Sequence, residues 1–522
     1  MGERVRKIPD LRWLFVAVII VALLIVTVAV NNNEATMNTA TLTNSLDVDN
    51  GDLKINWDQY PTTTIDLNGP LKIDKSGIYH LTGDLEDGSI TINSAKAEVK
   101  LILDNVTLSN SNGPVIECYE AEDLVIELVG ESTIIDGTNY AASTDEDVTG
   151  AIYSKADLTL QGEGTLYLNA NHEDAIVGKD DVKIASGNYV INASDDGIRG
   201  KDSVYIVGGN VDITSGSDCI KSTNEIDSGK GFVLIENGNL NLNSTSAKGI
   251  KAIKTILIKN GNAIISSYDD SIHSDNYVDI TGGQINISAG DDAIHANTEL
   301  IIEGGNIHVA KSYEGLEAQV VTINDGEISL NTNDDGINAG GGADESSKNR
   351  AGANQFNADE NCVININGGN LYVNSSGDGI DSNGWLYFNG GTVIVDGPTN
   401  NGNGALDAGM GIVTNGGEVT AIGSSGMAES LGNNSSIFNV EIYLNSIQPA
   451  NTTITIKDSE ENTIMEHTSK KQFSHIAYGS DKLVIAGTYT LYINDEKYDE
   501  FTISDITTTV GKTQQITPPN RK

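Results

Sequence analysis

Basic residues and aromatic residues are both scarce in this sequence. Lysine and arginine number 31 against 73 aspartates and glutamates, which gives a formal net charge of −42 at pH 7. Nucleic acids require a basic contact surface, so a nucleic-acid partner is excluded. The acidity suits a solvated exterior or a surface that binds cations. Aromatic residues make up 5% of the chain, too few for an extensive platform that stacks on sugar rings.

Cysteine and proline are also rare. The three cysteines, Cys118, Cys219 and Cys362, are widely separated and form no Cys-x-x-Cys motif. They indicate neither a disulfide framework nor a zinc site, and their number leaves room for at most one disulfide. We expect all three at small apolar positions. Glycine is abundant, with 56 residues, but shows no Gly-X-Y period, which excludes collagen.

One long hydrophobic run lies near the N-terminus. Residues 13–30 are all apolar or threonine, and this length can span a bilayer. Four basic residues precede the run and none follows before Lys54, so residues 1–12 are predicted to be cytoplasmic and the rest of the chain extracytoplasmic. A cleaved signal peptide is the alternative, but the run lacks a clear cleavage site. The sequence therefore predicts a single-pass protein of the cell membrane, with a linker over 31–50.

A four-residue unit recurs through the middle of the chain. Its best copies have two acidic residues, a small residue and isoleucine: Glu173–Ile176, Asp195–Ile198, Asp269–Ile272, Asp291–Ile294 and Asp334–Ile337. Degenerate copies begin at Ser217, Ala247, Tyr313 and Gly377. Most second positions are 22 residues apart, as from Asp174 to Asp196, and a column of glycines follows the same period. Longer intervals indicate insertions near 222–230 and 340–360. A fixed period of this length predicts a solenoid.

The local pattern selects a parallel β-helix over other solenoids. Segments such as Leu240–Asn243 and Ile285–Ser288 alternate apolar and polar residues, as strands do, and helical periodicity is absent. The fourth position of the unit is always isoleucine or leucine and the sixth is always small, so both are expected to point inward. The fifth is mostly polar and is expected to point outward. We predict an all-β fold: a right-handed, single-stranded parallel β-helix over 51–435, with about 22 residues per coil.

Residues 436–510 break the period. Segments at 440–444, 453–456, 483–485 and 489–493 are predicted to be antiparallel strands of a small C-terminal β subdomain that covers the last coil. Residues 511–522 are predicted to be a tail.

Equivalent residues of adjacent coils lie about 4.8 Å apart in such a fold, so the acidic pairs form ladders of carboxylates. Neighbouring carboxylates at this spacing repel by about 3–4 kcal/mol at an effective dielectric of 20, unless cations lie between them. Oxygen ligands of this kind suit Ca²⁺. The alternative is that the Asp-Asp-Gly sequences only form turns, in which both residue types are favoured. The predicted Ca²⁺ ligands are Asp174, Asp195, Asp196, Asp218, Asp269, Asp270, Asp291, Asp292, Asp334, Asp335, Asp378 and Asp381.

Two lysines and two histidines adjoin the ladder. Lys248 interrupts the acidic column, and Lys251 lies near it. Either lysine could abstract a proton next to a uronate carboxyl group, but we favour the interpretation that Lys248 replaces a missing cation and neutralises the ladder. His273 and His295, one coil apart, could bind a transition metal; we favour a solvent-facing stack.

Candidate carbohydrate contacts are the aromatic residues beside the ladder, Tyr268, Tyr313 and Trp385, together with His273 and His295. The insertion at 340–360 is a candidate lip of a binding groove.

The repeated Asp-Asp-(Gly/Ala/Ser)-Ile unit, the Gly-Gly-Asn turns and the trailing β segment resemble the clostridial-type carbohydrate-binding β-helix family over roughly 60–510. The resemblance implies a fold similar to that of pectate lyases, binding of cellulose and polygalacturonate without established catalysis, and Ca²⁺ at the turns that retain aspartate. Lys248 and Glu314 depart from the pattern, which puts Ca²⁺ at those rungs in doubt.

The leading hypothesis is therefore a non-catalytic, membrane-anchored surface protein that binds acidic or β-linked polysaccharide through Ca²⁺. A β-helix polysaccharide lyase of the pectate type and a purely structural surface adhesin are the alternatives.

Overall fold

A computed structural model describes residues 45–140, 148–340 and 358–511 of the chain. The chain divides into two units, 1–47 and 48–522, and the fold described below belongs to the second. The predicted anchor at 13–30, the cytoplasmic segment 1–12 and the tail from 512 onward lie outside the described residues. Among the residues that are described, no helix has the length and apolar character needed to cross a membrane.

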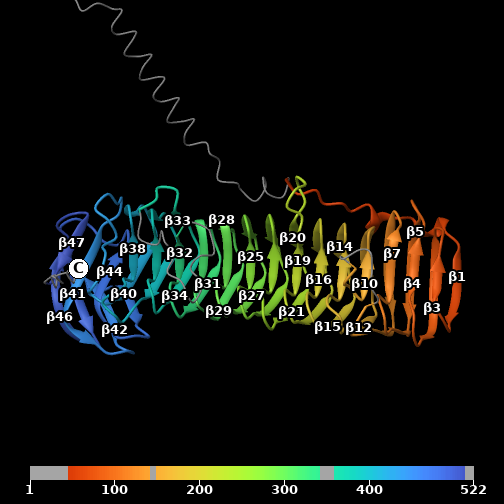
Figure 1. The fold of residues 1–522 in the computed structure, drawn as a ribbon. Helices are drawn as coiled ribbons and strands as arrows, with labels where there is room; N and C mark the ends of the chain where they lie inside the picture. Colours follow the sequence, from red (N-terminus) through yellow and green to blue (C-terminus); the bar gives the residue numbers. More distant parts are fainter. Residues whose placement is uncertain (1–44, 141–147, 341–357, 512–522) are drawn as a thin grey trace, which may run out of the picture. The chain divides into compact units, whose positions relative to one another are not determined.

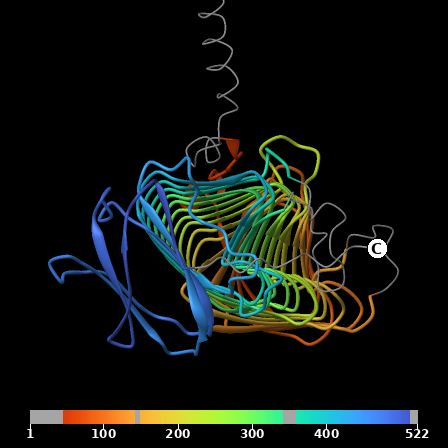
Figure 2. The same ribbon diagram turned by 90° about the vertical axis from the view of Figure 1, so that its left-hand side faces the viewer.

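The second unit is a parallel β-solenoid of about 14 turns (Figure 1). Seen from the end, successive turns superimpose, because each strand pairs in parallel with its equivalents in the turns before and after (Figure 2). Each turn contributes strands to three columns. The prediction of an all-β parallel solenoid is confirmed, and the only helical elements in the described part of this unit are the short 3₁₀ turns η1 (Asp52–Lys54) and η2 (Trp57–Gln59).

The first column holds the short strands built on the repeated unit: β2 (Leu71–Ile73), β4 (Ile90–Asn93), β7 (Ile116–Glu120), β10 (Ile152–Ser154), β13 (Ile176–Gly178), β16 (Ile198–Gly200), β19 (Ile220–Ser222), β22 (Ile250–Ala252), β25 (Ile272–Ser274), the starts of β28 (Ile294–Ile302) and β30 (Leu316–Ile323), β32 (Ile337–Ala339), β35 (Ile380–Ser382) and β38 (Leu406–Ala408).

The second column begins with β1 (Thr62–Leu67), which precedes the first column. Its other members each follow a first-column strand after a corner: β3 (Gly77–Leu85), β5 (Glu98–Asp104), β8 (Asp123–Val129), β11 (Asp157–Gly162), β14 (Asp181–Ile184), β17 (Ser203–Ile206), β20 (Phe232–Ile235), β23 (Thr255–Ile258), β26 (Tyr277–Ile280), the ends of β28 and β30, β33 (Val363–Ile366), β36 (Trp385–Phe388) and β39 (Gly411–Thr414).

The third column completes each turn: the end of β3, β6 (Thr107–Asn110), β9 (Glu131–Asp136), β12 (Thr165–Ala170), β15 (Asn188–Ala193), β18 (Asn210–Ser215), β21 (Asn239–Ser244), β24 (Asn262–Ser266), β27 (Gln284–Ser288), β29 (Asn306–Ser312), β31 (Glu327–Thr332), β34 (Asn370–Asn374), β37 (Thr392–Asp396) and β40 (Glu418–Gly423).

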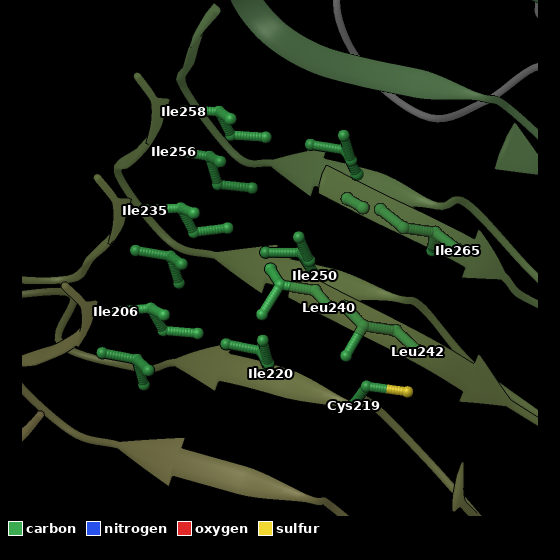
Figure 3. Packing of buried hydrophobic residues seen from close by; sticks show 14 of the residues in the cluster. Ile206, Cys219, Ile220, Ile235, Leu240, Leu242, Ile250, Ile256, Ile258 and Ile265 are labelled. Atoms are coloured by element: carbon green, nitrogen blue, oxygen red, sulfur yellow. The ribbon is translucent and has the colours of Figure 1, made fainter. Parts of the chain in front are cut away.

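Aliphatic side chains stack on their own kind inside the solenoid (Figure 3). The backbone register places Ile220 on Ile250 in the first column and Leu242 on Ile265 in the third. The fourth and sixth positions of the repeated unit are buried, as at Ile250 and Ala252, which are both 0% exposed. The inward direction predicted for these positions is therefore confirmed. All three cysteines are buried and free, so the chain has no disulfide.

The periodic glycines precede the third-column strands, and they are needed there because the backbone has positive φ. The φ angle is 97° at Gly209 and 128° at Gly238. A Cβ atom at Gly209 would also lie 2.9 Å from the carbonyl oxygen of Gly187, one turn earlier. Side chains other than glycine adopt such backbone angles at a cost in free energy. The glycine column thus sets the corner that leads into each third-column strand.

Both insertions detected in the sequence fall at the corner between the first and second columns. The first lies between β19 and β20, where Asn224 Oδ1 accepts the backbone N–H groups of Ile226 and Asp227. The second lies between β32 and β33, and residues 341–357 within it are outside the described part. The registers of β19 on β22 and of β20 on β23 continue undisturbed beside the first insertion.

The chain before β1 packs against the outer face of the second column. Asp52, in η1, forms a 2.8 Å ion pair with Lys183 of β14, and both side chains are almost fully buried. Asp52 also accepts a hydrogen bond from Thr159 of β11. The first strand starts at Thr62, so residues 51–61 precede the coils and do not form one. Loss of either charge of this buried pair would leave the other unpaired, at a substantial cost in stability.

The C-terminal subdomain continues the third column. Strand β44 (Phe473–Gly479) pairs antiparallel with β40, and β41 (Asn439–Gln448) and β47 (Thr507–Val510) extend this sheet. A second, antiparallel sheet has the order β43 (Thr463–Thr468), β42 (Thr453–Asp458), β45 (Thr488–Ile493) and β46 (Glu496–Thr502). A separate hydrophobic cluster, with members from both sheets, forms the subdomain core.

One predicted strand of this subdomain is wrong. Residues 483–485 lie in a turn region, and Val484 and Ile485 are more than half exposed. Three consecutive apolar residues are typical of a buried strand, but only Leu483 of the three is buried. The parallel pairing of β47 with β41 also differs from the antiparallel arrangement that was expected.

Candidate functional site

The second-position carboxylates of the repeated unit form a hydrogen-bonded ladder along the corner before the first column. Oδ1 of Asp174 accepts the backbone N–H of Asp196 at 3.0 Å, and Oδ1 of Asp196 accepts that of Asp218 at 3.0 Å. The same 3.0 Å contact joins Asp218 to Lys248 and Asp270 to Asp292. One oxygen of each carboxylate thus belongs to the fold, because it satisfies a buried backbone donor in the next turn.

The second oxygen of each carboxylate faces the fifth position of the unit, and in the turns of β16, β19 and β22 that position is basic. Arg199 Nη2 lies 2.6 Å from Asp174 Oδ2. Lys221 Nζ lies 3.2 Å from Asp196 Oδ2 and 3.0 Å from Asp218 Oδ2. The structure therefore brings these predicted Ca²⁺ ligands together but also supplies protein cations to them. This supports the view that charge neutralisation of the ladder is a structural requirement.

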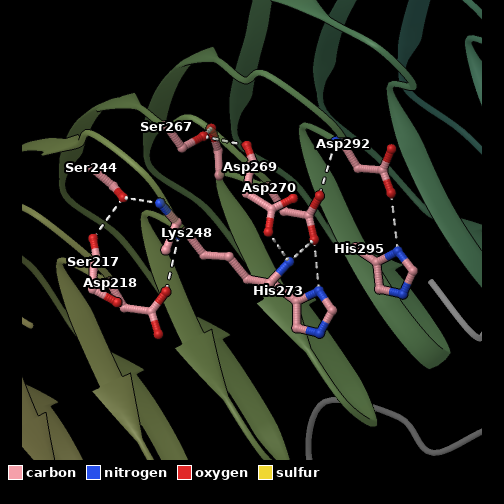
Figure 4. A network of polar contacts seen from close by, with 12 residues as sticks. Ser217, Asp218, Ser244, Lys248, Ser267, Asp269, Asp270, His273, Asp292 and His295 are labelled. Atoms are coloured by element: carbon pink, nitrogen blue, oxygen red, sulfur yellow. Dashed lines mark hydrogen bonds and ion pairs between the residues drawn. The ribbon is translucent and has the colours of Figure 1, made fainter. Parts of the chain in front are cut away.

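Lys248 plays the same part from the second position itself (Figure 4). Its Nζ lies 2.5 Å from Asp270 Oδ2 and 3.0 Å from Asp269 Oδ2. Burial acts to lower the pKa of Lys248, but the charges and hydrogen bonds of Asp270 and Asp269 raise it above its ordinary value. The favoured interpretation of Lys248, as a replacement for a cation, agrees with this geometry. Lys251, on β22, faces away from the core in register with Lys221 and His273.

His273 and His295 stack on each other, with ring centroids 4.8 Å apart and ring planes inclined by 10°. Their predicted solvent-facing position is wrong, because His273 is 5% exposed and His295 is 0% exposed. His273 Nδ1 lies 2.8 Å from Asp270 Oδ2, and His295 Nδ1 lies 3.1 Å from Asp292 Oδ2. The sequence could not reveal this, since an outward direction from the coil core does not guarantee contact with water. Buried rings are out of reach of a sugar, so their predicted role as carbohydrate contacts is not supported.

The C-terminal turns of the ladder carry an acidic residue at the second position, the fifth position or both. Burial raises the pKa of Asp335 and of Asp381 well above the ordinary range, and neighbouring carboxylates raise both further. Burial and the charges of Asp407 and Asp334 raise the pKa of Asp378 to about 7, although the hydrogen bond from the backbone N–H of Gly404 acts to lower it. Among the described residues, the charged neighbours of these three groups are other carboxylates.

Two members of this acidic end were missed from the sequence. Asp407 lies in register with Asp381 on the last first-column strand, and burial and the Asp407 charge raise the pKa of Glu429 to about 7. The signal for Asp407 was present, because Asn403–Ala408 is a further degenerate copy of the unit, with leucine at the fourth position and Asp407 at the fifth. Glu429 follows the last turn and belongs to no repeat, so no pattern could have placed it here.

The first-position carboxylates form a more exposed row beside the buried one. Asp195 is exposed, Asp269 and Asp334 are partly buried, and Asp291 is 5% exposed. Carboxylate oxygens of Asp269, Asp270 and Asp291 lie within 4.8 Å of one another, as do those of Asp174, Asp195 and Asp196. The two parallel rows that the period predicted are therefore present, with different access to solvent.

The three predicted aromatic contacts lie in different surroundings. Tyr268 is 62% exposed beside the ladder. Tyr313 is partly buried, and a hydrogen bond with Asp334, together with burial, raises the pKa of its hydroxyl. Trp385 is on the second column, stacks on Tyr387 with centroids 6.0 Å apart, and lines a pocket of about 360 Å³ that Glu429 also lines. Because Trp385 belongs to a different column, the three do not make one stacking surface.

An amide ladder runs along the outer face of the third column and was not identified as a site from the sequence. The Nδ2 groups of Asn210, Asn239 and Asn262 each donate to the Oδ1 of the asparagine one turn earlier, at 2.7, 2.7 and 2.8 Å. The asparagines that follow the periodic glycines were the available signal.

Shallow grooves follow this amide ladder. One, of about 360 Å³, is lined by the ladder together with Val190, Asp212, Asn241 and Ile264. A second, of about 490 Å³, lies further along the same column and includes His308, Ser329 and Tyr372. Ile264 is 58% exposed. Apolar patches with fixed amide donors and acceptors beside them are the surroundings that a sugar ring, with its C–H faces and hydroxyl edges, can contact.

A family model and a curated relative carry the same description. A family model described as carbohydrate-binding domain-containing protein matches residues 68–315 and 249–353. A carbohydrate-binding domain-containing protein of Acetivibrio thermocellus is 34% identical over 128 residues, which are 24% of this chain and 45% of the relative. The chain therefore spans less than half the length of this curated relative.

A solved structure described as a polysaccharide lyase-like protein from C. thermocellum, a gadolinium derivative, is 28% identical. The match covers 48% of this chain and 96% of that one, with a TM-score of 0.36.

Proposed function

Because the chain belongs to the family of carbohydrate-binding domain-containing proteins, we propose that it is a non-catalytic protein that binds polysaccharide in a Ca²⁺-dependent manner. The observation that carries the proposal is the position of the family match. Residues 68–353 contain most of the acidic ladder and the central part of the amide ladder, the two regular polar arrays of the solenoid. The glycan class is polygalacturonate or a cellulose-like β-glucan.

The acidic end of the ladder fits Ca²⁺ best. Asp335, Asp378 and Asp381 are buried or partly buried carboxylates whose pKa values are raised by burial and by one another. Hard oxygen donors in this number suit Ca²⁺, which would offset their mutual repulsion and could also bridge to a uronate. Asp174, Asp196 and Asp218 are weaker candidates, because Arg199 and Lys221 already neutralise them.

The glycan chain itself is proposed to lie along the third column. Rungs of the solenoid recur at the inter-strand spacing of about 4.8 Å, so an extended polymer that follows the axis meets the same amide group at every rung. Exposed Ile264 and partly exposed Tyr372 offer apolar contact for sugar faces. Tyr268 is a further candidate contact beside the acidic ladder.

The lyase alternative is less well supported. A base that abstracts the proton next to a uronate carboxyl group must be neutral, whereas the two carboxylates bound to Lys248 hold it in its charged form. We also propose, from the hydrophobic run at 13–30, that the protein is anchored in the cell membrane with the solenoid outside.

Pull-down of the purified full chain on polygalacturonate and on cellulose, with Ca²⁺ and with a chelator, tests the function. Retention with Ca²⁺ and its loss with chelator are expected. Titration calorimetry with Ca²⁺ should show weaker uptake in Asp381→Asn, and unchanged uptake in the control Asp495→Asn, which alters an exposed turn of the subdomain. Failure to bind any glycan in either condition would refute the proposal, and equal retention in both would refute the role of Ca²⁺.

A matched pair of variants tests the surface. Ile264→Ser removes an exposed apolar side chain from the groove, and Ile226→Ser removes one that is 90% exposed on the 222–230 insertion. Binding should weaken several-fold only in Ile264→Ser. Equal binding by both variants would place the glycan elsewhere.

A further inference from the structure

His295, Asp292 and Glu317 converge on one point inside the solenoid wall. His295 Nδ1 lies 3.1 Å from Asp292 Oδ2 and 2.9 Å from Glu317 Oε2. The three residues are 0%, 1% and 3% exposed, and one ligand atom from each lies within 4.8 Å of the others. Asp292 and His295 belong to one turn and Glu317 to the next, so the cluster joins two coils.

The other ring nitrogen of His295 has a partner of its own. Nε2 lies 2.9 Å from Oδ1 of Asn297, an amide oxygen that can only accept a hydrogen bond. Nδ1 faces two buried carboxylates at hydrogen-bond distance, so a metal at this point would take the place of the proton that joins them. A donor set of one imidazole nitrogen and two carboxylate oxygens around one point is a metal-binding arrangement, and a partner that fixes the tautomer is typical of histidine ligands.

His273, one turn earlier, has the same position but different neighbours. Its Nδ1 lies 2.8 Å from Asp270 and its Nε2 lies 3.0 Å from Asp275, so both nitrogens face carboxylates. Asp270 also contacts the ammonium group of Lys248. Asp270 is thus shared between His273 and a lysine, whereas at the His295 rung two buried carboxylates from adjacent turns face one imidazole nitrogen.

The geometry points to a site for a borderline divalent transition metal, Zn²⁺, held by His295 Nδ1, Asp292 Oδ2 and Glu317 Oε2. Ca²⁺ takes six to eight oxygen ligands, and an imidazole nitrogen favours Zn²⁺ and similar metals instead. The site is thus distinct in metal class from the Ca²⁺ sites of the proposed function. A metal here would link the turn of β28 to the turn of β30.

The test measures metal and not glycan, so its result is independent of polysaccharide binding. The full chain is treated with chelator, refolded with excess Ca²⁺ and a small excess of Co²⁺ as a spectroscopic probe, and its metal content and visible absorption are measured. We expect one Co²⁺ per chain, with the intense visible absorption bands of a nitrogen–oxygen site. Zn²⁺ should displace this Co²⁺, and Ca²⁺ should not.

Two variants and a control complete the experiment. His295→Phe keeps the ring that stacks on His273, and Glu317→Gln keeps the shape of the side chain; each should reduce Co²⁺ content at least tenfold. His308→Phe alters an exposed histidine on the third column and should leave the content unchanged. Circular dichroism in chelator establishes that each variant folds. No Co²⁺ uptake by the parent chain, or equal uptake by a folded Glu317→Gln variant, overturns the proposal.

Discussion

The backbone amide of Asp218 donates a 3.0 Å hydrogen bond to Oδ1 of Asp196, one turn earlier in the solenoid. Both residues are buried, so the bond satisfies a donor that water cannot reach. The repeated aspartates therefore have two separate tasks. One oxygen holds successive turns in register, and the other is available to a lysine, an arginine, a histidine or a metal ion.

The first prediction separates these tasks. Asp196→Asn keeps an oxygen at the Oδ1 position, whereas Asp196→Ala leaves the Asp218 amide without an acceptor and should cost about 1–3 kcal/mol more in the free energy of unfolding. Hydrogen exchange at the Asp218 amide should accelerate in the alanine variant and change little in the asparagine variant. Equal acceleration in both would mean that the charge, and not the acceptor, holds the register.

Replacement of Lys248 by methionine tests neutralisation of the ladder. The change leaves the fully buried Asp270 with less compensation, and loss of one partner of a buried ion pair costs about 3–5 kcal/mol. Lys259→Met, which breaks a 3.0 Å ion pair with Glu236 at the surface, is the control and should cost less than about 1 kcal/mol. Both are measured by urea unfolding.

Addition of Ca²⁺ should restore part of the stability of Lys248→Met, because oxygens of Asp269, Asp270 and Asp291 lie close enough to share an ion. An unchanged melting temperature of the variant in millimolar Ca²⁺ would contradict the view that lysine and Ca²⁺ are equivalent in this ladder.

The interior columns are predicted to dominate stability. Ile250→Ala removes a side chain that is 0% exposed and stacked between Ile220 and Ile272, and should cost about 2–5 kcal/mol. Ile264→Ala removes one that is 58% exposed and should stay within about 0.5 kcal/mol of the parent. Guanidinium unfolding of the two variants compares their free energies of unfolding directly. Similar losses of stability would mean that the Ile264 side chain is covered in an interface.

The pH dependence of stability should be reduced by Asp157→Asn. Burial, and then the charges of Asp181 and Asp180, raise the pKa of Asp157 to about 7, although Lys183 opposes them. The folded state therefore holds this proton more tightly than the unfolded state, and the free energy of unfolding falls as pH rises from about 4 to 7.

The variant lacks this titration, so relative to the parent it should gain on the order of 2 kcal/mol between pH 5 and pH 8. Melting curves across this range check the expectation, with Glu496→Gln, at the exposed start of β46, as the control. A constant difference between Asp157→Asn and the parent at all pH values would contradict it.

The period of 22 residues was sufficient to predict the solenoid and the interior, because stacking forces equivalent residues such as Ile220 and Ile250 into one environment. It was not sufficient for the polar positions. Asp196 and His295 were placed correctly along the chain, but their burial depends on what covers the outer face of the first column, and periodicity carries no such information.

Other features depend on contacts between distant segments. The ion pair between Asp52 and Lys183 joins a 3₁₀ turn to a strand more than a hundred residues later. Glu429 approaches the ladder from beyond the last turn. Neither contact follows the period of the repeat, so the sequence pattern does not predict it and only the three-dimensional structure reveals it.

The corner between the first and second columns accommodates extra residues while the strands on either side keep their partners, as the continuous pairing of β19 with β22 and of β20 with β23 demonstrates. Peptides inserted at this corner would therefore be presented without any change in the strand pairing of the rest of the solenoid. Descendants of such a protein can acquire new recognition loops there by simple lengthening, while the stacked interior stays under unchanged constraint.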